Sequence, residues 1–113
     1  MRIAILLVLF LSACSSGEDA DLQYIKEARS IAAEWALINE QASAGKLTET
    51  YVQSMRHWLR DDLRTVNGSL ANPGAPYGDQ IRQLLAKPSD AAPAELRAHA
   101  DVLKQIEDGL ESA

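Results

Sequence analysis

Apolar residues recur at alternating steps of four and three from Asp21 onward, and this spacing constrains the fold more than any other feature. The first such series is Tyr24, Ala28, Ile31, Trp35, Ile38 and Ala42. Because an α-helix turns once every 3.6 residues, these side chains share one face, while Glu27 and Glu34 lie away from it. The spacing predicts an amphipathic helix, and we expect Gly45 to end it in a left-handed conformation.

A second helix is expected after Gly45, with Thr48 as its N-cap. Its apolar series is Val52, Met55, Leu59, Leu63, Val66 and Leu70. Because the connection around Gly45 is short, the two helices should pack as an antiparallel hairpin. We expect the centre of the core to be formed by Trp35, Met55, Trp58 and Leu59.

Turn-forming residues fill positions 67–78, after which a short helix capped by Asp79 and ended by Pro88 is predicted. A last helix should begin near Pro93 and reach residue 110. Its apolar series is Leu96, Ala100, Leu103, Ile106 and Leu110. No segment shows the period of two that a strand requires. The sequence therefore predicts an all-α fold, a small antiparallel bundle made of a helical hairpin, one short helix and one long C-terminal helix.

The first residues have the layout of an export signal, with Arg2 followed by an apolar run over positions 3–11. That run is shorter than the roughly 20 apolar residues that a membrane-spanning helix needs. Directly behind its last residue come two small residues and a cysteine, in the order Leu11, Ser12, Ala13 and Cys14. This order resembles the lipobox of bacterial lipoprotein precursors.

The resemblance implies that residues 1–13 are a cleaved signal peptide and that Cys14 carries a diacylglycerol. Residues 14–20 would then form a flexible tether, and residues 21–113 one helical domain. Ser15 after the cysteine favours an outer-membrane location facing the periplasm, with the inner membrane as the alternative. A plain secretory signal, cut near Ala13 without lipid, is the other interpretation of this leader.

The chain is acidic, with 16 Asp and Glu against 11 Lys and Arg, a net charge of −5. Without Arg2 ten basic residues remain against 16 acidic ones, which gives −6 for the predicted mature part. This balance argues against nucleic acid as a partner. Cys14 is the one cysteine of the chain, so an intramolecular disulfide is excluded.

Groups that could carry chemistry are few, and no catalytic residues, metal site or cofactor are predicted. His57 and Asp61 are four residues apart, as in an ordinary surface pair on a helix, although the same spacing would suit two ligands of a metal. His99 lies inside the last apolar series and is interpreted as a boundary histidine bonded to a neighbour, with a pH-sensing group as the alternative. Asn39 is expected to fix helix register. An enzyme is not predicted.

Arg56, Arg60 and Arg64 follow one another at steps of four and form a cationic row on the second helix. We expect this row to lie away from the apolar series, with Glu49 or acidic residues of another helix balancing its charge. The alternative is a contact with an anion, namely phosphate, a lipid headgroup or an acidic partner protein.

These observations predict a membrane-anchored envelope lipoprotein that acts as a helical protein-interaction or structural module for an unidentified envelope partner. Two alternatives stay open at this point. One is an acidic inhibitor or immunity-type lipoprotein of a cationic envelope enzyme, and the other is a carrier or sensor of a small ligand.

Replacing the cysteine tests the anchor. Cys14→Ser should leave the helical fold intact but release the protein from membranes or block its processing, because the diacylglycerol is attached through sulfur. Fractionation of cells fed a labelled fatty acid measures both effects. Label entering the Cys14→Ser chain would exclude Cys14 as the attachment point.

Overall fold

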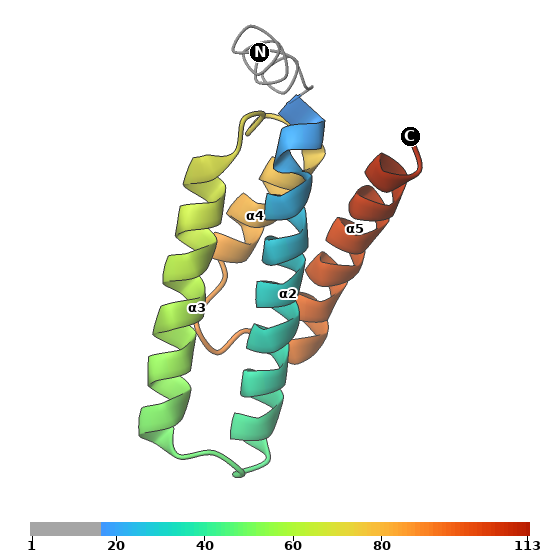
Figure 1. The fold of residues 1–113 in the computed structure, drawn as a ribbon. Coiled ribbons are helices and arrows are strands. Elements are labelled where there is room, and N and C mark those ends of the chain that lie inside the picture. The colour runs from blue at the N-terminus through green and yellow to red at the C-terminus, as the bar shows by residue number, and fades with distance from the viewer. Residues whose placement is uncertain (1–16) are drawn as a thin grey trace, which may run out of the picture.

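The computed structural model describes residues 17–113, which form four helices connected by short loops (Figure 1). The helices are α2 (Gly17–Ser43), α3 (Glu49–Ser69), α4 (Pro76–Leu85) and α5 (Pro93–Glu111). The described part contains helices and no strand, so the predicted all-α class is confirmed. The predicted leader and lipobox, including Cys14, lie outside the described residues.

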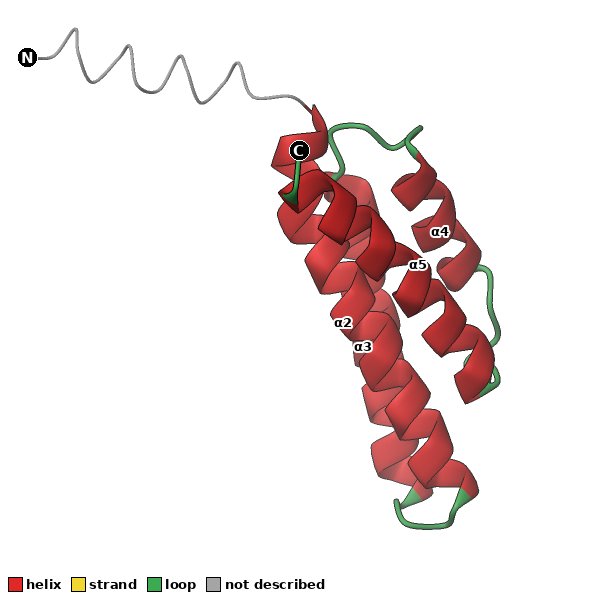
Figure 2. Ribbon diagram, turned by 90° about the vertical axis from the view of Figure 1, so that its right-hand side faces the viewer, coloured by secondary structure: helices red, strands yellow, loops and turns green. Residues whose placement is uncertain are grey.

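Helix α2 is the centre of the bundle and packs against α3 on one side and α5 on the other (Figure 1). Ion pairs fix its register with α5. They are Lys26 with Glu111, Arg29 with Glu107 and Glu40 with Arg97. Partners of rising number on α2 have falling number on α5, so these two helices are antiparallel. Helix α4 covers the remaining side, where it contacts α3 and α5 (Figure 2).

The turn of the α2–α3 hairpin forms as the sequence predicts. Gly45 has a φ of +71°, the left-handed conformation that ends α2. The Thr48 side chain then accepts a hydrogen bond of 3.3 Å from the backbone N–H of Tyr51, which caps α3.

Two helix starts differ from the predictions. Helix α2 begins at Gly17, so the predicted tether over residues 14–20 is helical from residue 17 onward. Glu18 and Asp19 stand in this first turn, where the helix dipole favours negative charge. Helix α4 begins at Pro76 with Ala75 as its N-cap, because proline suits the first turn. Asp79 is therefore not the cap; it lies inside the helix and forms an ion pair with Arg82.

The core consists of the inward faces of all four helices. Its largest fully buried apolar side chains are Trp35, Leu59, Leu63, Leu96 and Leu103 of the predicted apolar series, Tyr77, Ile81 and Leu84 of α4, and Ile25 of α2, which was not in the predicted series. Trp35 and Leu59 occupy the predicted centre, and Met55 is half-buried beside it. Trp58 was placed in this centre by the sequence analysis, and that prediction is wrong, because its side chain is 59% exposed.

Asp21 is a buried charge that joins the start of α2 to the loop between α3 and α4. Its carboxylate accepts hydrogen bonds from the backbone N–H groups of Ala71 and Asn72, at 2.7 and 2.8 Å, and from the Tyr77 hydroxyl at 2.6 Å. Burial alone raises the pKa of this carboxyl, but the three hydrogen bonds outweigh burial and hold the pKa below its usual value. The same contact and burial raise the pKa of the Tyr77 hydroxyl.

Truncation of the central aromatic residue should be severe. Trp35→Ala leaves a cavity in the middle of the bundle and is expected to lower the free energy of unfolding by ~3 to 5 kcal/mol. The matched control is Trp58→Ala, which should change it by about 0.5 kcal/mol or less, because Trp58 is exposed. Chemical denaturation followed by circular dichroism measures both. Equal losses in the two variants would contradict the assigned core.

The buried carboxylate predicts a pH effect with a defined sign. Because the folded-state pKa of Asp21 is lowered, its contribution to stability is present above the unfolded-state pKa and is lost as the pH falls through the folded-state value. Asp21→Asn should cost about 1 to 3 kcal/mol at pH 7, because the amide puts an N–H group among donors. The cost should be smaller at pH 3, because protonation of Asp21 begins to remove its own contribution in the parent chain. Asp101→Asn, at an exposed position of α5, is the control. A pH-independent loss in the Asp21 variant would overturn this assignment.

Candidate functional site

The arginine row on α3 turns gradually from the core side of the helix toward solvent. Each step of four residues goes roughly 40° beyond one full turn of 3.6 residues. Measured around the helix axis from Val52, which faces the core, Arg56, Arg60 and Arg64 therefore lie at roughly 40°, 80° and 120°. The observed burial agrees, because Arg56 and Arg60 are half-buried and Arg64 is exposed. The row therefore flanks the apolar series, and the prediction that it lies away from that series is wrong for its first two members.

The backbone that connects α4 to α5 lies against this flank and is bound to α2. Trp35 Nε1 donates a 2.8 Å hydrogen bond to the Ser89 carbonyl oxygen. Asn39 Nδ2 donates to the carbonyl oxygens of Ser89 at 3.1 Å and Ala91 at 2.8 Å. Asn39, predicted to fix helix register, is thus buried and holds the α4–α5 connection on the central helix.

The partners of Arg56 and Arg60 are uncharged. Arg56 Nε donates to Asn39 Oδ1 at 2.7 Å. Arg60 donates from Nη1 to Ser89 Oγ at 3.0 Å and from Nη2 to the Leu85 carbonyl at 3.2 Å. Its guanidinium carbon also lies 5.6 Å from the centre of the Trp35 ring, within reach of a cation–π attraction.

The predicted charge balance is therefore wrong for these two arginines. Glu49 does not pair with the row; it accepts a hydrogen bond from Gln53 instead. Within residues 17–113, neither Arg56 nor Arg60 forms an ion pair with a carboxylate. The Nε atom of Arg60 is buried and has no hydrogen-bond partner there. Two positive charges are thus held in place without being neutralised.

Arg64 and His57 form the outer rim and share one acid. Arg64 Nη1 lies 2.5 Å from Asp61 Oδ1, and His57 Nε2 lies 3.1 Å from Asp61 Oδ2. All three side chains are at least half-exposed. The interpretation of His57 and Asp61 as an ordinary surface pair of a helix is confirmed.

These groups line a cleft of about 590 Å³ between α3 and the α4–α5 connection. We call it the arginine cleft, and its lining residues are Gln53, Arg56, His57, Arg60, Arg64 and Ser89. The lining contains three arginines and no carboxylate. Guanidinium groups recognise carboxylates and phosphates through paired, charge-assisted hydrogen bonds, so the cleft is suited to an anionic group.

His99 is not among the residues that line the arginine cleft. Its Nδ1 is 2.7 Å from Oε1 of Gln80, and the ring is half-buried. Burial is the main cause that lowers the pKa of His99, and nearby Lys87 adds to it against the opposing effect of Glu95. The interpretation as a boundary histidine bonded to a neighbour is confirmed.

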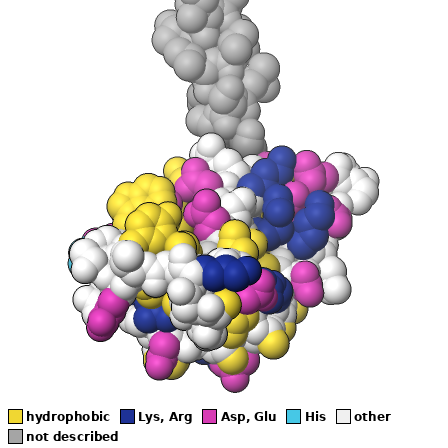
Figure 3. Space-filling view, turned by 90° about the horizontal axis from the view of Figure 1, so that it is seen from below, with side chains coloured by type: hydrophobic (Ala, Val, Ile, Leu, Met, Phe, Trp, Pro, Cys, Tyr) yellow, Lys and Arg dark blue, Asp and Glu magenta, His cyan; other side chains and the backbone are white. Residues whose placement is uncertain are grey.

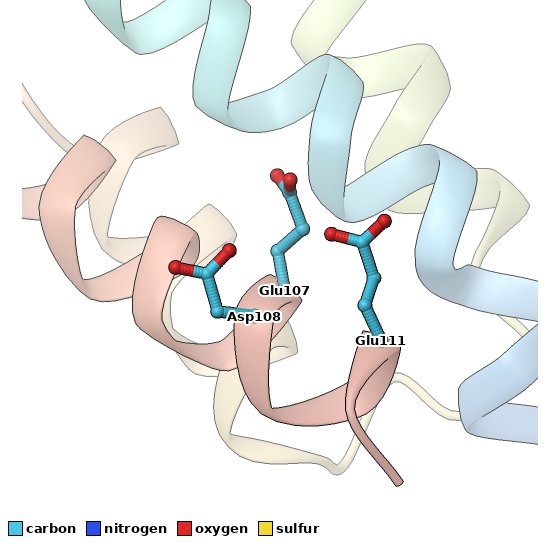
Figure 4. Close-up of side chains that lie close together, drawn as sticks. All are labelled: Glu107, Asp108 and Glu111. Atoms are coloured by element: carbon cyan, nitrogen blue, oxygen red, sulfur yellow. The ribbon is translucent and has the colours of Figure 1, made fainter.

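Three carboxylates gather near the end of α5 (Figure 4). They belong to Glu107, Asp108 and Glu111. Glu107 is buried and bound by Arg29 at 2.7 Å, Asp108 is bound by Lys104 at 2.9 Å, and Glu111 is bound by Lys26 at 3.1 Å. These cations account for the cluster as part of the junction between α2 and α5. The roles of Asp21 and Glu107 could not be predicted from local spacing, because their partners lie 50 to 78 residues away along the chain.

Four large hydrophobic side chains of the described residues are exposed, namely Leu37, Tyr51, Trp58 and Val102. Figure 3 shows hydrophobic side chains at the surface on the end of the molecule that carries the α2–α3 turn. Tyr51 and Trp58 are 48% and 59% exposed and stand two helical turns apart on α3. They occupy the flank of α3 opposite the arginine row. Helix α3 thus presents an aromatic flank and a cationic flank on either side of its buried face.

In comparisons with known proteins, no protein-family model, no curated protein and no solved structure matches this chain. Within the described residues, no helix has both the length and the apolar character needed to cross a membrane.

Proposed function

We propose that this chain is a lipid-anchored module of the bacterial cell envelope that binds an acidic segment of a partner protein in the arginine cleft. In this proposal residues 1–13 are removed, Cys14 carries the lipid, and the helical domain faces the periplasm from the outer membrane, or from the inner one. The anchor rests on the likeness of residues 11–14 to a lipobox. The anchor would fix the location of the domain, and the cleft would select its partner.

One observation carries the binding part of the proposal. Arg56 and Arg60 are held by uncharged partners in a cleft that no carboxylate lines, on a protein whose net charge is −5. Acidic side chains are abundant among residues 17–113, yet none of those residues forms an ion pair with Arg56 or Arg60. Bringing an external carboxylate to these guanidinium groups would add charge-assisted hydrogen bonds at positions that are already ordered, which lowers the entropic cost of binding.

The exposed aromatic flank of α3 supports an interaction role over a purely structural one. Large exposed aromatic side chains are enriched where proteins meet partners. Tyr51 and Trp58 lie on the same helix as the arginine row, so one partner could contact both flanks. The charge of the cleft is positive, which separates this proposal from an inhibitor that would use an acidic surface against a cationic enzyme.

Site-directed crosslinking in the native envelope tests the proposal. A photoreactive amino acid in place of the exposed Asp90, next to the lining residue Ser89, should capture a defined protein partner. Arg56→Gln should reduce the yield at least about tenfold, because a carboxylate would lose a charged partner. Arg64→Gln should reduce it less, since Arg64 already pairs with Asp61.

The control is Arg97→Gln, which removes an exposed arginine of α5 that pairs with Glu40 outside the cleft. It should leave capture unchanged, and circular dichroism should show all variants folded. Capture that is equal in the Arg56, Arg64 and Arg97 variants would contradict a role for the arginine cleft. Retained membrane fractionation of each variant separates a binding defect from loss of the anchor.

A further inference from the structure

A second cavity adjoins the arginine cleft at the α2–α3 turn and shares two of its residues. It has a volume of about 250 Å³. Its lining consists of Ala42, Leu47, Glu49, Val52, Gln53 and Arg56. Gln53 and Arg56 also line the arginine cleft, so the two spaces meet at these side chains.

Arg56 lines both spaces, so it places a binding position for a carboxylate next to an apolar cavity. Arg56 uses Nε for Asn39, and within the described residues its two Nη groups have no hydrogen-bond partner. Ala42, Leu47 and Val52 supply the apolar wall of the neighbouring cavity. A ligand that fills both spaces needs an anionic group and an apolar group close together.

Gln53 adds an acceptor between the two spaces. Its Nε2 donates to Glu49 Oε1 at 3.3 Å, which orients the amide and leaves Oε1 able to accept from a ligand N–H. Inorganic phosphate has no apolar group, so it would leave the apolar wall of the second cavity uncovered. Glu49 also places a negative charge beside the second cavity, which disfavours a dianion more than a monoanion.

We infer that the site recognises the C-terminal residue of a partner polypeptide, with its α-carboxylate on Arg56 and Arg60 and its apolar side chain in the second cavity. On a terminal residue both groups branch from one Cα atom, which matches two spaces that meet at one side chain. The backbone N–H of the same residue donates to Gln53 Oε1. This inference rests on the proposed function and specifies which carboxylate is bound.

Fluorescence anisotropy with the full chain in lipid nanodiscs tests the inference. The probe is a five-residue peptide with fluorescein at its amino end and leucine with a free carboxylate at the other. Capping that carboxylate as an amide should weaken binding at least about tenfold. Replacing the terminal leucine by glycine should weaken it about tenfold, because the apolar cavity then stays empty.

Two variants separate the apolar cavity from the arginines. Ala42→Leu fills the cavity and should weaken the leucine-ended peptide about tenfold while leaving the glycine-ended peptide unchanged. Ala33→Leu makes the same substitution at an exposed position of α2 and should change neither. Thermal melts confirm that both variants are folded.

Three results would overturn the inference that a terminal residue is bound. Equal affinity for the acid and the amide would overturn recognition of a terminal carboxylate. Inorganic phosphate binding more tightly than the peptide would overturn the peptide assignment, as would a blocked peptide with an internal aspartate that binds as well as the free acid. In these cases, crosslinking that still depends on Arg56 would leave the proposed function standing. Without that dependence, both proposals fall.

Discussion

The hydrogen bonds from Trp35 and Asn39 to the carbonyl oxygens of Ser89 and Ala91 determine how the rest of the molecule is arranged. A buried polar side chain without a partner costs free energy, so these two side chains of α2 require acceptors inside the bundle. The backbone between α4 and α5 supplies them. It is thereby fixed beside α3, and the start of α5 is placed for antiparallel packing on α2.

The same arrangement determines which positive charges stay without a carboxylate partner. Asn39 uses both of its donor hydrogens on the α4–α5 connection, and its oxygen accepts from Arg56. An aspartate there would neutralise Arg56 but could not donate to the two carbonyls. Ser89, held by these bonds, in turn accepts from Arg60 through its hydroxyl. A neutral network thus orients two cations, which is how an acidic domain comes to hold a cationic cleft.

Periodicity was sufficient to predict the helices, because burial of one apolar face decides where each helix forms. It failed for Trp58, which lies roughly 100° around the α3 axis from Leu59. Its place in the hairpin fixes its position along α3 but not the direction in which its side chain points. The start of α4 was misplaced because Pro76 begins the helix three residues before Asp79. In both cases the residue type matched the predicted role, as a core residue or as a helix cap, but the position of the residue on its helix did not.

The candidate site was predicted only in part. The spacing of Arg56, Arg60 and Arg64 revealed a row, but the partners of Arg56 and Arg60 come from α2, α4 and the α4–α5 connection; they are Asn39, Leu85 and Ser89. Local sequence spacing carries no information about contacts between such distant segments. The drift of a four-residue step around a 3.6-residue helix could have shown that the row turns toward the core at Arg56.

The most direct measurement is the ¹⁵N–¹H NMR spectrum of the arginine Nε–Hε groups in the full chain at neutral pH. Arg56 and Arg60 should give separate resonances with slow solvent exchange, because Arg56 Nε donates to Asn39 of α2 and Arg60 Nε is buried, while exposed Arg97 should exchange rapidly. Asn39→Ala should collapse the Arg56 resonance toward that of Arg97. A parent spectrum in which all three arginines exchange alike would contradict the ordered, unneutralised pair on which the cleft depends.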